Sequence, residues 1–257
     1  MKKYELIKQE NGFFRIRALK SFGCVEEGEL GGIIEKESNL SQDGNAWVFG
    51  NARVFGNAWV FGNAEVCGNA EVCGNARVFG NAGVYGNARV CGNARVFGNA
   101  GVYGNARVFG NARVYGNARV YGNALVCGNA EVCGDALVCG NAEVCDDARV
   151  CGDALVCDDA RVCGDARVYG NAEVCGDTTI ISDINEPFLN IVAIQCEKRL
   201  MTVYQHINGN VKCNIGCQKG MTLEMLERRI KEDGGMKPHR KQYVNIMKNA
   251  KSILNIE

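Results

Sequence analysis

Histidine is scarce in this chain, and no excess of either charge is present. The 257 residues include only two histidines, His206 and His239, and neither lies in the repeated region described below. Histidine is the usual general base near neutral pH, so the repeats lack the group on which most acid–base enzymes rely. The formal charge is zero, with 29 basic and 29 acidic residues, which gives no general reason to expect a polyelectrolyte partner.

Long apolar runs are also missing. No run reaches the roughly 18 residues that a membrane-spanning helix needs, and no secretory signal peptide opens the chain. We therefore expect a cytoplasmic protein with no membrane partner. Regular pairs of outward threonines, which an ice-binding surface would need, do not occur in the body of the repeats.

A single hexapeptide, Gly-Asn-Ala-x-Val-x, fills the chain from Gly44 to Ile181 without an insertion. Its 138 residues make 23 units. A short fixed period means that no unit can bury its apolar face alone, so neighbouring units must stack. Ala and Val alternate with the two variable positions, so they should point inward and the variable residues outward. Gly-Asn, or sometimes Gly-Asp, should form the corner, because these residues tolerate a positive φ.

Three short strands should close one triangular coil of 18 residues, which gives about 7.7 coils over the 138 repeat residues. At a strand spacing of roughly 4.8 Å, the prism should be about 37 Å long. We therefore predict a mostly β chain built around a left-handed parallel β-helix over residues 44–181. An N-terminal β cap over residues 1–43 should cover its open end, which would otherwise expose unpaired backbone.

The C-terminal residues 182–257 should form a small α+β domain. Leu200–Tyr204 and Val211–Asn214 are typical of a hairpin closed through Asn208-Gly209. A helix should run from an N-cap at Thr222 to Lys231, and a second helix should begin at Pro238. In the N-terminal cap, Phe13–Leu19 should be a strand.

Sorting the outward residues by the 18-residue coil predicts faces with different chemistry. A surface of arginines beside aromatic residues suits nucleic acid, nucleotides or an acidic partner. Alternatively, the arginine stems lie along the rings and cover them, which we favour over binding of single-stranded nucleic acid. This candidate binding face comprises Trp59, Phe61, Arg77, Phe79, Arg95, Phe97, Arg113 and Tyr115.

A second candidate surface is an apolar edge formed by Leu125, Leu137, Cys139, Leu155 and Cys157. Soluble monomers rarely leave such a patch bare. We therefore expect either that residues 182–257 fold back over this edge or that a second chain covers it.

Charge is polarised along the repeats. Residues 44–130 hold seven Arg and two Glu, whereas residues 131–177 hold three Arg, three Glu and eight Asp. Antiparallel pairing of two prisms would match these opposite signs, which favours a homo-oligomer or another protein as the partner.

Eleven of the fifteen cysteines occupy the outward position that other units give to Phe or Tyr. We expect free thiols, because parallel side chains on one flat face disfavour the disulfide torsion and because the cytoplasm is reducing. Stacked cysteines could share a soft metal ion, but flat columns give poor tetrahedral geometry. We predict no catalytic residue, metal site or cofactor. The eleven are Cys67, Cys73, Cys91, Cys127, Cys133, Cys139, Cys145, Cys151, Cys157, Cys163 and Cys175.

The three parts together resemble the YdcK-like hexapeptide-repeat family of the kind carried by phages and prophages. The resemblance rests on Arg15-Ile16-Arg17-Ala18-Leu19, Gly28-Glu29-Leu30-Gly31-Gly32, Asn39-Leu40-Ser41, Val211-Lys212-Cys213-Asn214-Ile215-Gly216-Cys217 and Gly220-Met221-Thr222-Leu223-Glu224. It implies a phage-encoded protein in the bacterial host cytoplasm, in a family whose members are labelled acyltransferase-like or polymer-forming.

Three functions are compatible with these observations. We favour a non-enzymatic, rigid β-helical scaffold that acts through its flat faces by self-association or partner recognition. The first alternative is a hexapeptide-type acyltransferase, although such enzymes resemble one another in using a histidine base and loops extruded from the coils. The second is a phage factor with an anti-defence role that binds a host protein, nucleic acid or nucleotide signal. Fold alone does not decide among them.

Overall fold

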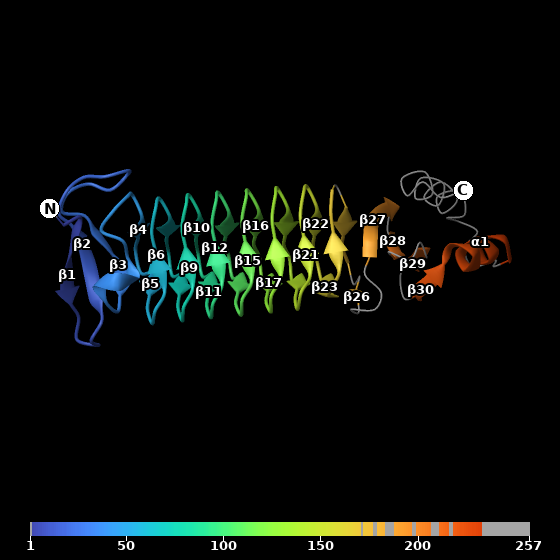
Figure 1. Ribbon diagram of the computed structural model, residues 1–257, viewed down its shortest axis with the longest axis horizontal. Helices are drawn as coiled ribbons and strands as arrows, with labels where there is room; N and C mark the ends of the chain where they lie inside the picture. The colour runs from blue at the N-terminus through green and yellow to red at the C-terminus, as the bar shows by residue number, and fades with distance from the viewer. Residues whose placement is uncertain are drawn as a thin grey trace.

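The computed structural model describes the backbone of residues 2–170, 172–176, 179–182, 188–196, 199–206, 211–215 and 218–232. Its centre is a parallel β-solenoid of about eight coils, and the predicted fold class is confirmed (Figure 1). The 23 hexapeptides form the 23 short strands β4 to β26. Each strand from β4 to β23 pairs in register with the strand 18 residues further on, as Arg95 pairs with Arg113, so the coil has the predicted length.

Three parallel sheets form the three faces of the prism. The cysteine face consists of β5 (Arg53–Val54), β8 (Glu71–Val72), β11 (Arg89–Val90), β14 (Arg107–Val108), β17 (Leu125–Val126), β20 (Glu143–Val144), β23 (Arg161–Gly164) and β26 (Thr179–Ser182). The tyrosine face consists of β4 (Trp47–Val48), β7 (Glu65–Val66), β10 (Gly83–Val84), β13 (Gly101–Val102), β16 (Arg119–Val120), β19 (Leu137–Val138), β22 (Leu155–Val156) and β25 (Glu173–Val174). The aromatic face consists of β6 (Trp59–Val60), β9 (Arg77–Val78), β12 (Arg95–Val96), β15 (Arg113–Val114), β18 (Glu131–Val132), β21 (Arg149–Val150) and β24 (Arg167–Val168).

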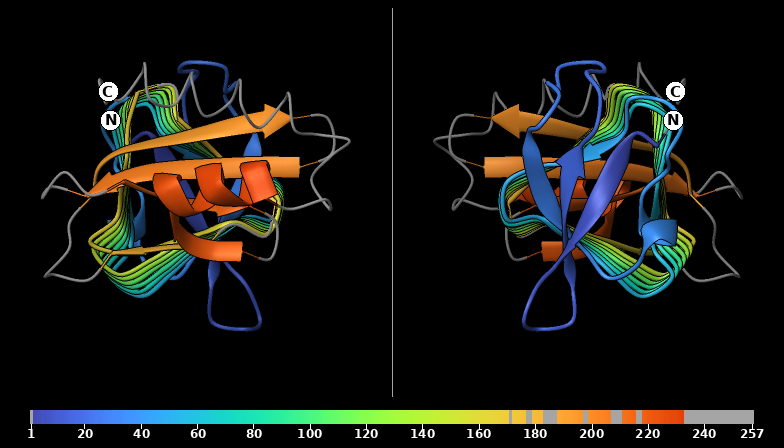
Figure 2. Two further views of the ribbon diagram at one scale, coloured as in Figure 1. Left: turned by 90° about the vertical axis from the view of Figure 1, so that its right-hand side faces the viewer. Right: turned by 90° about the vertical axis from the view of Figure 1, so that its left-hand side faces the viewer.

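The core is made by the constant residues of the repeat. From Ala46 to Val174, every alanine and valine of the units is buried, with at most 6 % of its surface exposed. At the corners the glycines have positive φ, and Gly116 shows why no other residue suits them. Its φ is 74°, and a Cβ there would lie 2.9 Å from the carbonyl oxygen of Gly134 in the next coil. The coils therefore superimpose when viewed along the axis (Figure 2).

Asparagine ladders run along the corners. Within a ladder, the Nδ2 of one residue donates to the Oδ1 of the residue 18 positions on, as Asn99 does to Asn117 at 3.0 Å. These ladders end on aspartate, which can only accept when ionised, as where Asn117 donates to Asp135 at 2.8 Å. At the opposite end of one ladder, Lys36 Nζ donates to Asn57 Oδ1 at 2.8 Å. Each ladder of amides is thus oriented in one direction along the prism.

The N-terminal cap extends the cysteine face. β1 (Tyr4–Lys8) and β2 (Phe14–Ala18) pair antiparallel, and β3 (Leu30–Ile34) joins β2 antiparallel to β5 in parallel. This confirms the strand predicted within residues 13–19. A short 3-10 helix, η1 (Glu37–Asn39), follows β3.

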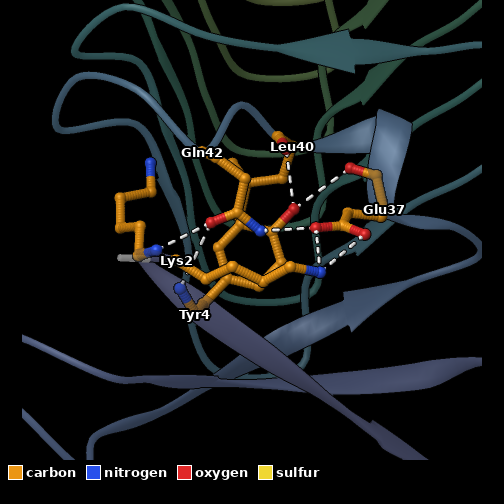
Figure 3. A network of polar contacts seen from close by, with 6 residues as sticks. Lys2, Tyr4, Glu37, Leu40 and Gln42 are labelled. Carbon is orange, nitrogen blue, oxygen red and sulfur yellow. Dashed lines mark hydrogen bonds and ion pairs between the residues drawn. The ribbon is translucent and has the colours of Figure 1, made fainter.

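Hydrogen bonds hold the cap together. Tyr4 donates its hydroxyl to the carbonyl of Leu40 at 2.7 Å, and Gln42 Nε2 donates to Glu37 Oε1 at 2.8 Å (Figure 3). The cap also buries Trp47 completely, although this residue stands at an outward position of the first unit. The reason is that the rings of Tyr4 and Phe22 pack edge-on against it at 6.0 and 5.3 Å.

Four antiparallel strands follow the last coil: β27 (Phe188–Cys196), β28 (Arg199–His206), β29 (Val211–Ile215) and β30 (Gln218–Thr222). The pairing of β28 with β29 confirms the predicted hairpin, whose turn lies outside the described residues. Helix α1 (Leu223–Glu232) confirms the first predicted helix, and the amide of Met225 donates to Thr222 Oγ1 at 3.2 Å as an N-cap. The helix predicted from Pro238 lies outside the described residues. In the part of the chain that is described, no helix is both long and apolar enough to cross a membrane.

Candidate functional site

The aromatic face carries a continuous stack of rings. The centroids of Phe61, Phe79, Phe97 and Tyr115 follow one another at 4.8, 4.9 and 5.0 Å with interplanar angles of at most 6°. Trp59 lies on Phe61 at 4.0 Å and closes the end nearest the cap. The ring spacing equals the strand spacing, so the inner rings cover one another and offer mainly their edges to a partner.

The arginines of this face stand beside the stack. Arg77, Arg95 and Arg113 are exposed. Within the described residues, guanidinium or ammonium groups lie over rings only at the capped end, where Arg53 lies over Phe13 at 4.9 Å. The guanidinium groups of Arg77, Arg95 and Arg113 therefore do not lie over the rings of this stack. Of the three arginines, only Arg113 has a carboxylate partner among the described residues. Its Nη1 lies 3.3 Å from Oε1 of Glu131.

Charge changes sign along the aromatic face. On this face, strands β6, β9, β12 and β15 carry three arginines and no acidic residue, and asparagines border them at the corners. Strands β18, β21 and β24 of the same face carry Glu131, Arg149 and Arg167. Four aspartates border them: Asp135, Asp147, Asp153 and Asp165. Burial, and then the Glu131 carboxylate, raise the pKa of Tyr115 at the boundary between the two halves. One half of the face is therefore cationic and the other anionic.

On the tyrosine face, two rings cover glycines. A Cβ at Gly83 would overlap the ring of Tyr85, and one at Gly101 would overlap that of Tyr103. Both glycines are buried as a result. The hydroxyl of Tyr85 donates to Glu65 at 3.1 Å, and burial followed by this carboxylate raises the pKa of Tyr85 to about 12.

The predicted apolar edge is less open than its composition suggests. Leu125, Leu137 and Leu155 are each half-buried among their neighbours in a single chain. Leu137 pairs with Leu155 in register on the tyrosine face, and Leu125 lies on the cysteine face. In Figure 1, β27 to β30 and α1 continue beyond the last coil along the axis. The described part of the C-terminal region therefore does not fold back over these leucines.

The prediction that all the repeat cysteines are free thiols is wrong. Three disulfides join cysteines 18 residues apart: Cys133–Cys151, Cys145–Cys163 and Cys157–Cys175. Their Cα atoms lie 4.6 to 4.7 Å apart, which is inside the range that a disulfide spans. The stacking of coils supplies this separation directly, and parallel side chains on one face do not prevent the bond.

The other repeat cysteines, including Cys139 of the predicted edge, are free thiols. Burial raises the pKa of Cys67 to about 12, with a smaller contribution from Glu65. Burial likewise raises the pKa of Cys73 to about 12, and its contact with Cys91 adds to the effect. Since the thiolate is the nucleophile and the metal ligand, these two thiols are poorly reactive at neutral pH.

Two clusters near the last coils unite cysteines with carboxylates. The ligand atoms of Glu143, Cys145 and Cys163 all lie within 4.8 Å of one another, as do those of Cys157, Asp158 and Cys175. Asp158 was not among the site residues predicted from the sequence. The sequence does mark these two corners. They read Cys-Asp-Asp, where the usual corner has Phe, Tyr or Cys followed by Gly and Asn.

Comparison with known families agrees with the coil described above. The YdcK β-solenoid repeat family matches five segments of the chain, residues 70–86, 88–104, 100–116, 112–128 and 160–176. No curated protein matches the chain. The matched segments all lie within the solenoid. Over these segments, the chain is similar to the YdcK β-solenoid repeat family.

Proposed function

We propose that this β-solenoid is a non-enzymatic scaffold that pairs with a second copy of itself through the aromatic face, with the two prisms antiparallel. The observation that carries the proposal is the change of charge along this one face. The cationic half holds Arg77, Arg95 and Arg113, and the anionic half is bordered by four aspartates. A twofold axis across the middle of the face brings each half against its opposite.

The ring stack supports a flat protein partner over a nucleic acid. Bases bind to aromatic side chains through an exposed ring face. Here neighbouring rings at 4.8 to 5.0 Å occupy those faces between Phe61 and Tyr115. The exposed ring edges form an apolar ridge between polar borders, which suits the centre of a protein interface.

The described coils also favour binding over catalysis. Between β4 and β25, every described connection is the same short corner, so no loop shapes a substrate cleft there. His206 lies in β28, outside the coils, and His239 lies outside the described residues. The acyltransferase alternative would need one of these histidines to reach the solenoid. The phage or prophage origin implied by the family resemblance stays a prediction.

Sedimentation velocity over a range of protein concentrations tests the proposal. We expect a dimer at low salt that dissociates at high salt, because the attraction is between exposed charges. Arg77→Glu with Arg95→Glu should abolish the dimer. The matched control is Arg107→Glu with Arg119→Glu, which makes the same change of charge on the other two faces and should leave the dimer intact.

Charge exchange sharpens this test. Asp135→Lys with Asp153→Lys should also give a monomer, because two cationic halves then meet. Mixing this variant with Arg77→Glu/Arg95→Glu should restore a heterodimer, since both contacts again join opposite charges. A wild-type monomer at every salt and concentration, or failure of the mixture to associate, would show the proposal to be wrong.

A further inference from the structure

The two corners at Asp146 and Asp158 differ from the other corners of the solenoid. Among the described residues, they alone combine a side chain with a positive φ, at 58° and 57°. Glycine occupies this position in the other described units, because it accepts positive φ without steric cost. A side chain held in this region at two equivalent places points to a role for the side chain itself.

Each of these aspartates contacts the cysteine that precedes it. The Oδ2 atom of Asp146 lies 3.7 Å from Cys145 Sγ, and that of Asp158 lies 3.8 Å from Cys157 Sγ. A disulfide sulfur has no proton to donate, so these contacts gain strength only when the sulfur carries a proton or shares a cation with the carboxylate. The amides of Gly164 and Gly176 donate to the same oxygens at 3.2 Å, which turns each carboxylate toward the next coil.

We propose that the reduced form of each cluster binds one thiophilic divalent cation of the Zn²⁺ class. Cys145, Cys163 and Asp146 form the first site, and Cys157, Cys175 and Asp158 form the second. Two thiolates and one carboxylate are a ligand set that Zn²⁺ accepts, with the remaining position open to water or another side chain.

The observed sulfur–oxygen separations fit this ligand set. Zinc–sulfur bonds of about 2.3 Å and zinc–oxygen bonds of about 2.0 Å place tetrahedral sulfur and oxygen ligands roughly 3.5 Å apart. The two observed Sγ–Oδ2 separations are 3.7 and 3.8 Å. A column of cysteines alone is flat and gives poor tetrahedral geometry.

The two sites differ in their possible fourth ligand. Glu143 precedes Cys145 by two residues on the same outward face, and its carboxylate lies within 4.8 Å of both sulfurs of the first site. The equivalent residue at the second site is Leu155. Glu143 is ion-paired with Arg161 at 2.9 Å, so joining the metal requires it to leave that partner. Among the described residues, the first site therefore has a second carboxylate close to its sulfurs, and the second site has one carboxylate.

A phosphine can reduce each disulfide to the two thiols that the proposed site needs. The phosphine takes up one oxygen atom from water and supplies two electrons, and the disulfide becomes two thiols as it gains those electrons and two protons. Binding of the cation then releases both thiol protons, because thiolates are the ligands. Residues 131–177 hold eleven acidic and three basic residues, so the surrounding charge favours the cation.

The experiment uses the full chain, reduced with a phosphine under anaerobic conditions and titrated with Co²⁺ and then Zn²⁺. We expect two Co²⁺ per chain with thiolate charge-transfer bands, displacement of Co²⁺ by Zn²⁺, and no such bands while the disulfides are intact. Asp146→Asn with Asp158→Asn should weaken binding at least about tenfold, since even supporting groups contribute that much. Asparagine tolerates positive φ, so this variant keeps its corners.

The matched control is Asp147→Asn with Asp159→Asn, which removes the adjacent aspartates and should leave the cobalt titration unchanged. Cys133 and Cys151 provide a second control, because their corner residue is Gly134. Replacing both by serine should not lower the stoichiometry. The proposal is overturned if Asp146→Asn/Asp158→Asn binds as tightly as the wild type, if the cysteines of the second control bind the metal, or if reduction abolishes the β-type circular dichroism.

Discussion

The first coils, residues 44–130, and the last coils, residues 131–176, share one core but differ in what ties coil to coil outside it. In the first coils, stacked rings at 4.8 to 5.0 Å and asparagine ladders join successive strands. In the last coils, three disulfides do so across Cα separations of 4.6 to 4.7 Å. Aspartate replaces most of the corner asparagines there. Any pair of side chains that matches the strand spacing can join one coil to the next, so the outward residues vary without altering the coil.

The largest effect should come from the shared core. Val114→Asp and Val150→Asp each bury an unpaired carboxylate in a fully buried position, one in each region. Each should lower the free energy of unfolding by about 3–5 kcal/mol, measured by chemical denaturation. The exposed Arg107→Asp should cost no more than about 0.5 kcal/mol. Equal costs for inward and outward changes would contradict the assignment of the core, and unequal costs for the two valines would contradict its uniformity.

Removal of a disulfide should affect the last coils and leave the first coils unchanged. Cys133→Ser with Cys151→Ser opens a cross-link between residues 18 apart, which is worth about 3 kcal/mol by loop-closure entropy. Hydrogen exchange should then show faster opening of β18 and β21 but not of β9 and β12. Cys73→Ser with Cys91→Ser is the matched control, because these residues stack with the same spacing as free thiols. A similar loss in both variants would mean that the disulfides add nothing specific.

Alkaline pH should act on the first coils. Burial raises the folded-state pKa of Cys67 and Cys73 from the ordinary 9.0 to about 12, whereas disulfide cysteines do not titrate. Between pH 9 and 12 the unfolded chain loses these protons and the folded chain keeps them, so stability falls as pH rises. Cys67→Ser with Cys73→Ser should flatten this fall in the pH dependence of the unfolding free energy. An unchanged slope would show that these thiols are not the cause.

The smallest effect should come from the ladders. Asn99→Ala removes one hydrogen bond accepted from Asn81 and one donated to Asn117, both at 3.0 Å. Because the site is exposed, the net cost should be about 1 kcal/mol in thermal unfolding. Asp153→Ala, at a corner with no side-chain hydrogen bond among the described residues, should cost less than about 0.5 kcal/mol. If the two substitutions cost the same, the ladder does not stabilise the first coils.

Strict periodicity explains why the solenoid could be predicted from the sequence. Because every unit has the same pattern, deciding that Ala112 and Val114 point inward decides which residues point inward in every other unit. The ends could not be predicted as well, because they depend on contacts that follow no period. Trp47 stands at an outward position, and only the folded cap shows that Tyr4 and Phe22 bury it. Likewise β1, β27 and β30 were not predicted.

The candidate sites were predictable in position but not in chemistry. The 18-residue sort placed Phe61, Phe79 and Phe97 in one column, which the structure confirms. It could not show that the rings lie face to face, since a side-chain torsion decides that. The same 18-residue period stacked Cys145 on Cys163, yet it did not show that these two sulfurs form a bond.

The triangular coil also determines which changes of length this protein can tolerate. Removing one hexapeptide leaves every inward alanine and valine in place, but it moves each later residue to the next face and breaks the columns of rings, amides and cysteines. Removing 18 residues shortens the prism by one layer, roughly 4.8 Å, and rejoins every column with itself. The solenoid can therefore be lengthened or shortened in whole layers without redesign of its surface, so the reach of the scaffold and the pattern it displays can change independently.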